Sequence, residues 1–403
     1  MPLKAVLIDM DDTLLRLDTQ AFTRRYMEPL AQFVIARSGV TADQYRTAFS
    51  ASIRAVTAGR DPLMFNRETM DNPLRAGLNV TPEQYRAITD EFFATHYRGL
   101  REGSSPALGA EHLIEFLKAR GLRVIVATNP LFNTPATEER LRWAAIDPAA
   151  VDFITTADNM HFVKPSLHYY LEILARFGLA PEDALMVGDD LSNDIAPAAL
   201  VGLATFHVRW NTTVSNQKSD PLAHSGTLGE VARLIGDGWP PARLPNTAVL
   251  SPDTLKAALL ADVAALHGLS HELSDLAWHM PLITDRRSPA ALVAALIARE
   301  RSFERPAMHR IVHEDNPFIQ PTSEIVVSAA PSDADQAAQV QNFADERAQT
   351  LAFLAELTPD QWKRTAQHAI FGPTNLAEMV GFTIQHDRRS LGRLAPTAVL
   401  PLL

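Results

Sequence analysis

Four short apolar segments in the first half of the chain are each followed by residues that carry carboxyl, hydroxyl or ammonium groups. The segments are β-branched or bulky, and they begin at Val6, Val124, Phe153 and Leu185. None shows the alternation of a half-exposed strand, and this is typical of strands covered on both faces in a parallel sheet. Helix-like segments such as residues 109–120 separate them. The pattern predicts a doubly wound α/β domain.

The second half of the chain has a different pattern. Glycine and proline residues cluster in residues 236–250, which predicts a linker. In residues 251–403 apolar side chains recur at helical spacing and almost no segment indicates a strand, so we predict an all-α four-helix bundle there. The proline-bearing residues 315–335 predict an extended connection.

Two local signals indicate helices within this bundle. Asn375 is followed three residues later by Glu378, which predicts a capping box at the start of the last helix. An apolar stripe at helical spacing predicts another helix and consists of Leu269, Leu273, Leu276, Met280 and Ile283.

The composition excludes several classes of protein. The 403 residues include 37 Lys and Arg and 47 Asp and Glu, a formal net charge of −10, which argues against a nucleic-acid partner. No segment reaches the roughly 20 apolar residues of a membrane helix. The chain has no cysteine, which excludes disulfides, thiolate nucleophiles and Cys-based metal sites. We therefore expect a cytoplasmic protein without nucleic-acid or membrane partners.

The polar residues that follow the predicted strands form one constellation. Ligands of open α/β sheets bind at the carboxyl ends of the strands, so side chains from four segments should meet there. These side chains are Asp9, Asp11, Thr128, Asn129, Lys164, Asp189, Asp190 and Asp194. So many carboxylates require a counter-charge, and Mg²⁺ prefers such oxygen ligands together with a substrate phosphate. Thr128 and Lys164 are then natural partners of the remaining phosphate oxygens.

Four sequence motifs resemble those of the haloacid dehalogenase-like (HAD) hydrolase superfamily and follow in the same order. They are Asp9-Met10-Asp11-Asp12-Thr13, Thr128 at a strand end, Lys164-Pro165, and Gly188-Asp189 with Asp194. The resemblance covers about residues 1–235. It implies a Rossmann-like core from residues 1–13 and 107–235, with a helical cap of the C1 type inserted at residues 14–106.

The resemblance also implies a mechanism. Asp9 would be the nucleophile that forms an aspartyl-phosphate, and Asp11 the general acid and then the base. An acid at Asp11 favours phosphatase over dehalogenase chemistry. Mg²⁺ would be held by Asp9, Asp11 and Asp189, with Asp190 or Asp194 in support. The substrate phosphate would be bound by Thr128, Asn129 and Lys164.

The leading hypothesis is therefore a Mg²⁺-dependent phosphohydrolase that acts on a small soluble phosphate monoester, with a cap that sets specificity. One alternative is phosphoryl transfer of the phosphosugar-mutase type. Another is a bundle that senses a ligand or binds a metal, joined to a slow phosphatase module. The sequence leaves the physiological substrate and a homodimer through the bundle open.

Residues 250–403 resemble the DinB-like (YfiT-like) four-helix bundle family. The resemblance rests on segments that include Leu269–Met280, Gly372-Pro373-Thr374-Asn375-Leu376 and Gln385-His386-Asp387. That family commonly binds a divalent transition metal through three histidines. Here His279 and His386 match two ligands, whereas Ser390 stands at the third position. The resemblance thus implies a degraded metal site, because Zn²⁺ and Ni²⁺ favour nitrogen ligands.

Overall fold

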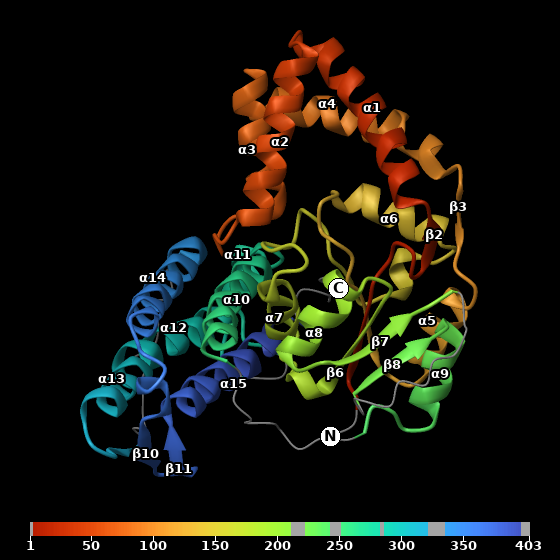
Figure 1. The fold of residues 1–403 in the computed structure, drawn as a ribbon. Helices are drawn as coiled ribbons and strands as arrows, with labels where there is room; N and C mark the ends of the chain where they lie inside the picture. The colour runs from red at the N-terminus through yellow and green to blue at the C-terminus, as the bar shows by residue number, and fades with distance from the viewer. Residues whose placement is uncertain (1–2, 211–221, 242–250, 283–285, 321–334, 396–403) are drawn as a thin grey trace. The chain divides into compact units, whose positions relative to one another are not determined.

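The computed structural model describes five parts of the chain: residues 3–210, 222–241, 251–282, 286–320 and 335–395 (Figure 1). The chain divides into two compact units. The first comprises Met1–Ser166 and Pro181–Leu244, and the second comprises Leu167–Ala180 and Pro245–Leu403. Of the helices in these described parts, none combines the length and the apolar content that a membrane span requires.

A six-stranded parallel sheet forms the centre of the first unit. Its order is β5-β4-β1-β6-β7-β8. The strands are β1 (Ala5–Ile8), β4 (Arg123–Val126), β5 (Phe153–Ile154), β6 (Ala184–Gly188), β7 (Ala204–Val208) and β8 (Ala223–Gly226). Ile8 of β1 is in register with Val126 and Val187, so three strands end side by side. This sheet confirms the doubly wound α/β fold expected from the sequence.

The strands β7 and β8 were not expected from the sequence. In β7, Thr205 and His207 interrupt the apolar run, and three of the four residues of β8 are exposed. β8 is the last strand of the sheet, so it has one neighbour and needs less apolar sequence, whereas β7 lies between β6 and β8 but has two polar side chains in its run. A search for continuous apolar runs therefore finds the central strands and misses these two.

Four short helices of the first unit flank the sheet. They are α5 (Ala110–Ala119), α6 (Thr134–Trp143), α8 (Ala196–Val201) and α9 (Leu228–Gly236). In α5, Ala110, Leu113, Ile114 and Leu117 are buried, which is the i, i+3, i+4, i+7 pattern of a helix with one apolar face.

A helical cap is inserted between β1 and β4. A two-stranded antiparallel ribbon of β2 (Leu15–Leu17) and β3 (Ser104–Pro106) marks where the chain enters and leaves it. Between these strands lie α1 (Thr19–Ser38), α2 (Ala42–Ala58), α3 (Asn66–Leu78), α4 (Pro82–Thr95) and the 3₁₀ helix η1 (Tyr97–Arg101). Thr41 and Thr81 each form a capping box with the glutamine three residues later, which fixes the starts of α2 and α4. The helical insertion confirms the predicted cap.

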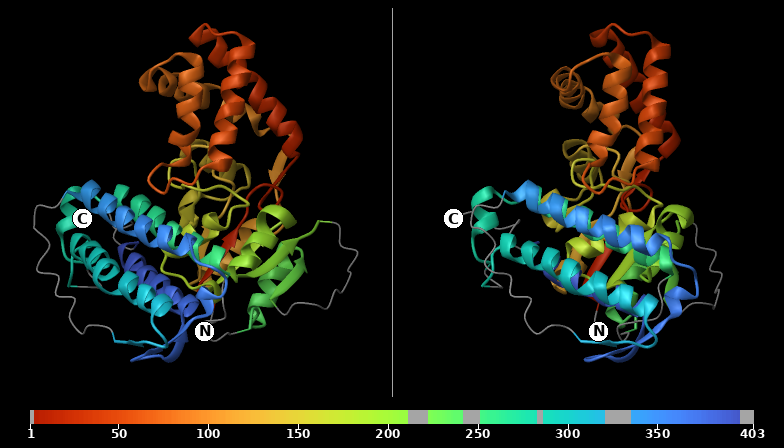
Figure 2. Two further views of the ribbon diagram at one scale, coloured as in Figure 1. Left: turned by 60° about the vertical axis from the view of Figure 1, so that its left-hand side comes forward. Right: turned by 90° about the vertical axis from the view of Figure 1, so that its left-hand side faces the viewer.

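Helices packed alongside one another form most of the second unit (Figure 2). They are α10 (Pro252–His271), α12 (Pro289–Arg299), α13 (Arg305–His313), α14 (Gln336–Ala355) and α15 (Leu376–Leu394). A π-helical turn, η5 (Glu300–Glu304), joins α12 to α13 into one longer helical segment. Asn375 accepts from the backbone N–H of Glu378 at 3.0 Å and donates to its carboxylate at 3.1 Å, so the predicted capping box is confirmed.

Two details of the bundle differ from the expectation. The apolar stripe does not form one helix: α10 ends at His271, and Ser274 caps the short α11 (Asp275–His279), leaving Leu276 and Met280 exposed. The last residue of that stripe, Ile283, lies outside the described residues. A small sheet of β9 (Phe318–Ile319), β10 (Thr365–His368) and β11 (Gly372–Asn375) also forms, where almost no strand was expected. Its strands are too short to leave a periodic signal.

One helix from the middle of the chain belongs to the second unit. Helix α7 (Leu167–Arg176) packs on α10 and α15, although the predicted core range 107–235 contains it in sequence. The turn after it approaches α15 so closely that a Cβ on Gly178 would lie 2.9 Å from the Cα of Gly392. Gly178 also has a φ of 64°. Both the close approach and the positive φ therefore require a residue without a side chain at this position.

The predicted connecting segments are only partly visible. Helix α9 ends at Gly236, where the predicted linker 236–250 begins, but residues 242–250 lie outside the described residues. The same holds for residues 321–334 of the predicted connection 315–335.

Candidate active site

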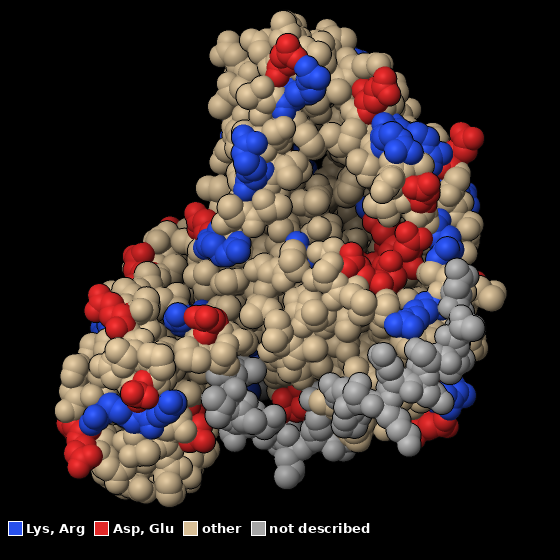
Figure 3. All heavy atoms as spheres, in the orientation of Figure 1, with Lys and Arg blue, Asp and Glu red and all other residues tan. Residues whose placement is uncertain are grey.

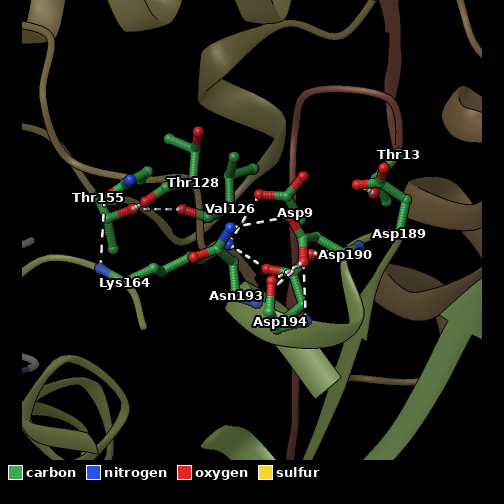
Figure 4. Close-up of polar contacts among 12 residues, drawn as sticks. Asp9, Thr13, Val126, Thr128, Thr155, Lys164, Asp189, Asp190, Asn193 and Asp194 are labelled. Carbon is green, nitrogen blue, oxygen red and sulfur yellow. Dashed lines mark hydrogen bonds and ion pairs between the residues drawn. The ribbon is translucent and has the colours of Figure 1, made fainter. Parts of the chain in front are cut away.

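The polar side chains predicted from four separate segments meet at the carboxyl ends of the parallel strands. Asp9 follows β1, Thr128 follows β4, Lys164 lies in the loop after β5, and Asp189 follows β6. Figure 4 shows these residues converging, together with Asp194 from the π-helical turn η4 (Leu191–Ile195). In Figure 3, acidic side chains gather beside a hollow under the cap helices.

Lys164 joins two of the carboxylates. Its Nζ lies 2.7 Å from Oδ1 of Asp9 and 2.6 Å from Oδ1 of Asp194. The Lys164 side chain is 2% exposed and the Asp194 side chain also 2%, so the three charges are shielded from solvent. An ammonium group that is buried this deeply needs such partners, because desolvation of an unpaired charge costs several kcal/mol.

Asp189 completes a cluster of three carboxylates with Asp9 and Asp194. One oxygen of each lies within 4.8 Å of the others, and no other group of three His, Asp or Glu residues in the described parts of the chain meets this criterion. Burial raises the pKa of Asp9 well above its usual range, although Lys164 opposes the rise. Burial and the neighbouring Asp194 raise the pKa of Asp189 to about 6. The cluster is therefore short of positive charge.

The cluster suits a magnesium ion. All its donor atoms are oxygens, which Mg²⁺ prefers. Three ionised carboxylates beside one ammonium group leave two negative charges uncompensated, and a divalent cation would balance them. Thr13 donates its hydroxyl hydrogen to Oδ1 of Asp189 at 3.3 Å, which orients that carboxylate toward the cluster. The residues present therefore fit the ion that the sequence predicts.

The two acids expected to support the metal have different surroundings. Asp190 accepts hydrogen bonds from the backbone N–H groups of Ser192 and Asn193 at 2.7 and 3.1 Å and from their side chains. Burial raises the pKa of Asp190, but these hydrogen bonds outweigh it and lower the pKa to about 2. Asp190 thus caps η4, whereas Asp194 lies in the cluster. The Asp194 carboxylate fills the place where a side chain at Gly188 would be, which explains the glycine before Asp189.

The loop after β4 is fixed by contacts that sequence reasoning missed. The hydroxyl of Thr155 donates to the backbone carbonyl of Thr128 at 2.7 Å, and Thr128 is 3% exposed. The side-chain oxygen of Asn129 accepts from the backbone N–H of Lys164 at 3.3 Å. These bonds join the loop after β4 to the segments that carry Thr155 and Lys164. No motif marks Thr155, which follows a two-residue strand.

Asp11 lies in a tight turn beside the cluster. The backbone N–H groups of Thr13, Leu14 and Leu15 all donate to the carbonyl of Met10, and Asp12 has a φ of 54°. One oxygen of Asp11 forms an ion pair with Arg140, whose side chain is 2% exposed. Sequence reasoning missed Arg140, because an arginine within a helix is usually a surface residue and nothing in the sequence distinguishes it from Arg142.

The residues of the predicted second metal site lie in the bundle. His279 ends α11 and is exposed, while His386 is half-buried on α15. Ser390 is buried, and its hydroxyl donates to the backbone carbonyl of His386 at 3.2 Å. The serine hydroxyl hydrogen is therefore used within its own helix. A metal at these residues stays a prediction.

Comparison with known proteins identifies both parts of the chain. Residues 3–202 match the model of the haloacid dehalogenase-like hydrolases, and residues 295–392 match that of the DinB superfamily. The chain is 24% identical over 241 residues to haloacid dehalogenase-like hydrolase domain-containing protein 3 of Xenopus laevis, covering 59% of this chain and 97% of that protein. It is 27% identical over 150 residues to the phosphoserine phosphatase of Thermus thermophilus, covering 37% of this chain and 57% of that enzyme.

Among solved structures, YfiT from Bacillus subtilis, described as a probable metal-dependent hydrolase, is similar at 18% identity. The match has a TM-score of 0.34 and covers 39% of this chain and 93% of YfiT. The two matches cover the sheet up to β6, the inserted helices and part of the helical second unit. Residues 3–202 thus form a haloacid dehalogenase-like hydrolase domain with an aspartate cluster at its sheet edge, and residues 295–392 belong to the DinB superfamily.

Proposed function

We propose that this protein is a Mg²⁺-dependent phosphohydrolase that cleaves a small phosphate monoester through a phosphorylated Asp9. The observation that carries the proposal is the buried contact of Lys164 with both Asp9 and Asp194, beside Asp189. A nucleophilic carboxylate, a cation for the phosphoryl oxygens and an excess of negative charge for a metal thus share one place. The names of several relatives, among them phosphoserine phosphatase and phosphoglycolate phosphatase, support a phosphate ester as substrate.

In the first step, an oxygen of Asp9 attacks phosphorus and the bond from phosphorus to the ester oxygen breaks. The leaving oxygen takes a proton from Asp11, and the product alcohol departs. In the second step, Asp11 takes a proton from water while the water oxygen attacks phosphorus. Inorganic phosphate leaves, and Asp9 regains its carboxylate. Asp11 ends the cycle protonated, as it began.

The other residues stabilise the charges that these steps move. Asp9, the backbone carbonyl of Asp11 and Asp189 would hold Mg²⁺, with Asp194 in support, and the ion would neutralise the phosphoryl oxygens. Lys164, fixed between Asp9 and Asp194, brings its positive charge to the phosphoryl oxygens. Thr128 and Asn129 lie on the loop that the Lys164 backbone contacts and complete the phosphate-binding side.

The cap is proposed to set specificity, because it lies over the site and is anchored to the core. The backbone N–H and the side-chain amide of Asn66, at the start of α3, donate to the carbonyls of Met160 and Phe162 at 2.8 and 3.2 Å. Arg67 pairs with Asp158 at 3.0 Å. Arg67 is one of the cap arginines, and it therefore holds the cap to the loop before Lys164. Its charge is already paired with carboxylates of the protein.

The proposal is tested by measuring phosphate release from p-nitrophenyl phosphate and a panel of metabolite phosphates, with Mg²⁺ and with EDTA. Asp9→Asn should abolish turnover. The matched control is Asp18→Asn, because Asp18 caps α1 through Ala21 and asparagine caps equally well. Full activity in Asp9→Asn would exclude Asp9 as the nucleophile. A requirement for an activating bisphosphate, without net phosphate release, would favour the mutase alternative.

A further inference from the structure

Arg140 has surroundings that the proposed chemistry does not yet use. It lies on α6, its side chain is 2% exposed, and its guanidinium forms an ion pair with Oδ2 of Asp11. The other oxygen of Asp11, Oδ1, is buried and has no hydrogen-bond partner among the described residues. One oxygen of this carboxyl is thus held by a buried cation, and the other has unused hydrogen-bonding capacity.

Aromatic rings fix the guanidinium from its other sides. Its central carbon lies 4.9 Å from the ring centroid of Phe132 and 5.3 Å from that of Phe22. Phe132 follows β4 of the core, and Phe22 belongs to helix α1 of the cap. Cation–π contacts of this kind are strongest where water is excluded. Arg140 is therefore held in one orientation by the core and by the cap.

The charge of Arg140 is permanent. Burial lowers the pKa of its guanidinium, but Asp11 and Tyr97 raise it by more, so the pKa lies above the ordinary value. A planar guanidinium also keeps the direction of its N–H bonds, whereas a lysine ammonium group does not. Arg140 can thus both attract the Asp11 carboxyl and determine where its free oxygen lies.

We propose that Arg140 is the positioning residue of the acid–base group: it holds Asp11 so that Oδ1 is presented to the leaving oxygen. This inference rests on the proposed function, in which Asp11 donates the proton. The guanidinium is already in place before the reaction, so little reorganisation is needed to orient the Asp11 carboxyl. In this proposal Arg140 acts through Asp11 and is not itself a catalytic residue.

A test must separate positioning from a merely structural role. Removing the positioning group should lower kcat/KM most for substrates whose leaving group needs a proton. Phenyl phosphate has a poor leaving group that needs the acid, whereas p-nitrophenyl phosphate has a good leaving group that departs without it. The two substrates have the same ring, so they should fit the site alike. The value of kcat/KM is the right measure, because it reports the steps up to the formation of the phosphoenzyme.

The variants are Arg140→Gln, Arg140→Lys and, as the matched control, Arg142→Gln. Arg142 lies on the same helix but is half-exposed and pairs only with Glu138 and Glu139 among the described residues. We expect Arg140→Gln to lower kcat/KM for phenyl phosphate roughly tenfold more than for p-nitrophenyl phosphate, part of the 10²–10⁴-fold that general acid catalysis supplies. Arg140→Lys should restore the ratio in part, and Arg142→Gln should leave it unchanged.

The ratio of the two substrates does not depend on the concentration of active enzyme, so a variant that folds less well still gives a valid result. An equal loss for both substrates in Arg140→Gln would overturn the positioning role, even if Asp9→Asn is inactive and the phosphatase proposal stands. Activity in Asp9→Asn would instead overturn the proposed function itself.

Discussion

The ammonium group of Lys164 lies 2.7 Å from the carboxylate of Asp9, although the two residues are 155 positions apart in the chain. Two parallel strands and a loop bring them together, and the same ammonium group reaches Asp194. The pair fixes the nucleophile of the proposed reaction within the cluster that Asp9 forms with Asp189 and Asp194.

Replacing Lys164 by methionine should reduce kcat/KM for p-nitrophenyl phosphate by roughly 10²–10³-fold, the usual effect of losing one preorganised charge partner. The control is Lys118→Met, which removes a half-exposed lysine that pairs with Asp152 at 2.7 Å. A Lys164→Met enzyme as active as the Lys118→Met enzyme would show that Lys164 takes no part in phosphoryl transfer.

Asp190 and Asp194 should respond differently to the same change. Asp194→Asn weakens the charge balance of the cluster, so the Mg²⁺ concentration needed for half-maximal activity should rise about tenfold or more. Asp190→Asn should leave that concentration nearly unchanged, because Asp190 only caps η4 and asparagine can also cap. Mg²⁺ titrations of the two variants measure this, and a larger shift in Asp190→Asn than in Asp194→Asn would contradict the assignment.

The effect of Mg²⁺ on stability should depend on pH. The pKa of Asp189 is about 6 in the folded protein, against ~4 unfolded, so the folded state binds more protons in this window. The metal-free protein therefore loses the contribution of Asp189 to stability as pH rises from about 4 to about 6. Mg²⁺ binds the ionised carboxylates and should reverse this loss.

Thermal unfolding with and without Mg²⁺ measures this prediction. At pH 7 saturating Mg²⁺ should raise Tm by on the order of 5 °C, and near pH 4.5 by much less. The same buffer with EDTA in place of Mg²⁺ serves as the reference. A stabilisation by Mg²⁺ that is equal at both pH values would contradict the prediction.

The bundle contains a buried ionic centre whose stability can be tested separately. The side chain of Arg347 on α14 is 1% exposed. Its Nη2 lies 3.0 Å from Oε2 of Glu300 and 2.5 Å from Oδ2 of Asp387. Arg347→Met would leave two buried carboxylates without their partner and should cost about 3–5 kcal/mol of stability. Arg310→Met, which breaks an exposed pair with Glu314, should cost less than ~1 kcal/mol. Calorimetry of full-length variants compares them, and equal losses would exclude a central role for Arg347.

The sequence predicted the centre of the sheet because buried parallel strands are continuous apolar runs, each followed by polar residues. The acids Asp9 and Asp189 were expected together for the same reason, since strands that end side by side bring their next residues to one edge. The capping box at Asn375 depends on residues three positions apart, so local sequence was sufficient for it.

Other features depend on contacts between distant segments, which no local pattern records. Arg140 was missed because its burial results from Phe22 in the cap and Phe132 in the core. Helix α7 lies between two strands of the first unit in sequence, yet its apolar residues pack in the second unit. The different surroundings of Asp190 and Asp194 arise from the direction of the η4 turn, which the spacing of acids does not determine.

The most direct test of the account is the detection of phosphate on Asp9 during turnover. The protein would be quenched in acid after mixing with substrate and Mg²⁺, digested with trypsin, and the peptide of residues 5–16 examined by mass spectrometry. We expect one added phosphoryl group on this peptide, located at Asp9 and labile to hydroxylamine, and none in Asp9→Asn. Turnover without phosphorylation of this peptide at any quench time, or phosphorylation elsewhere, would contradict it.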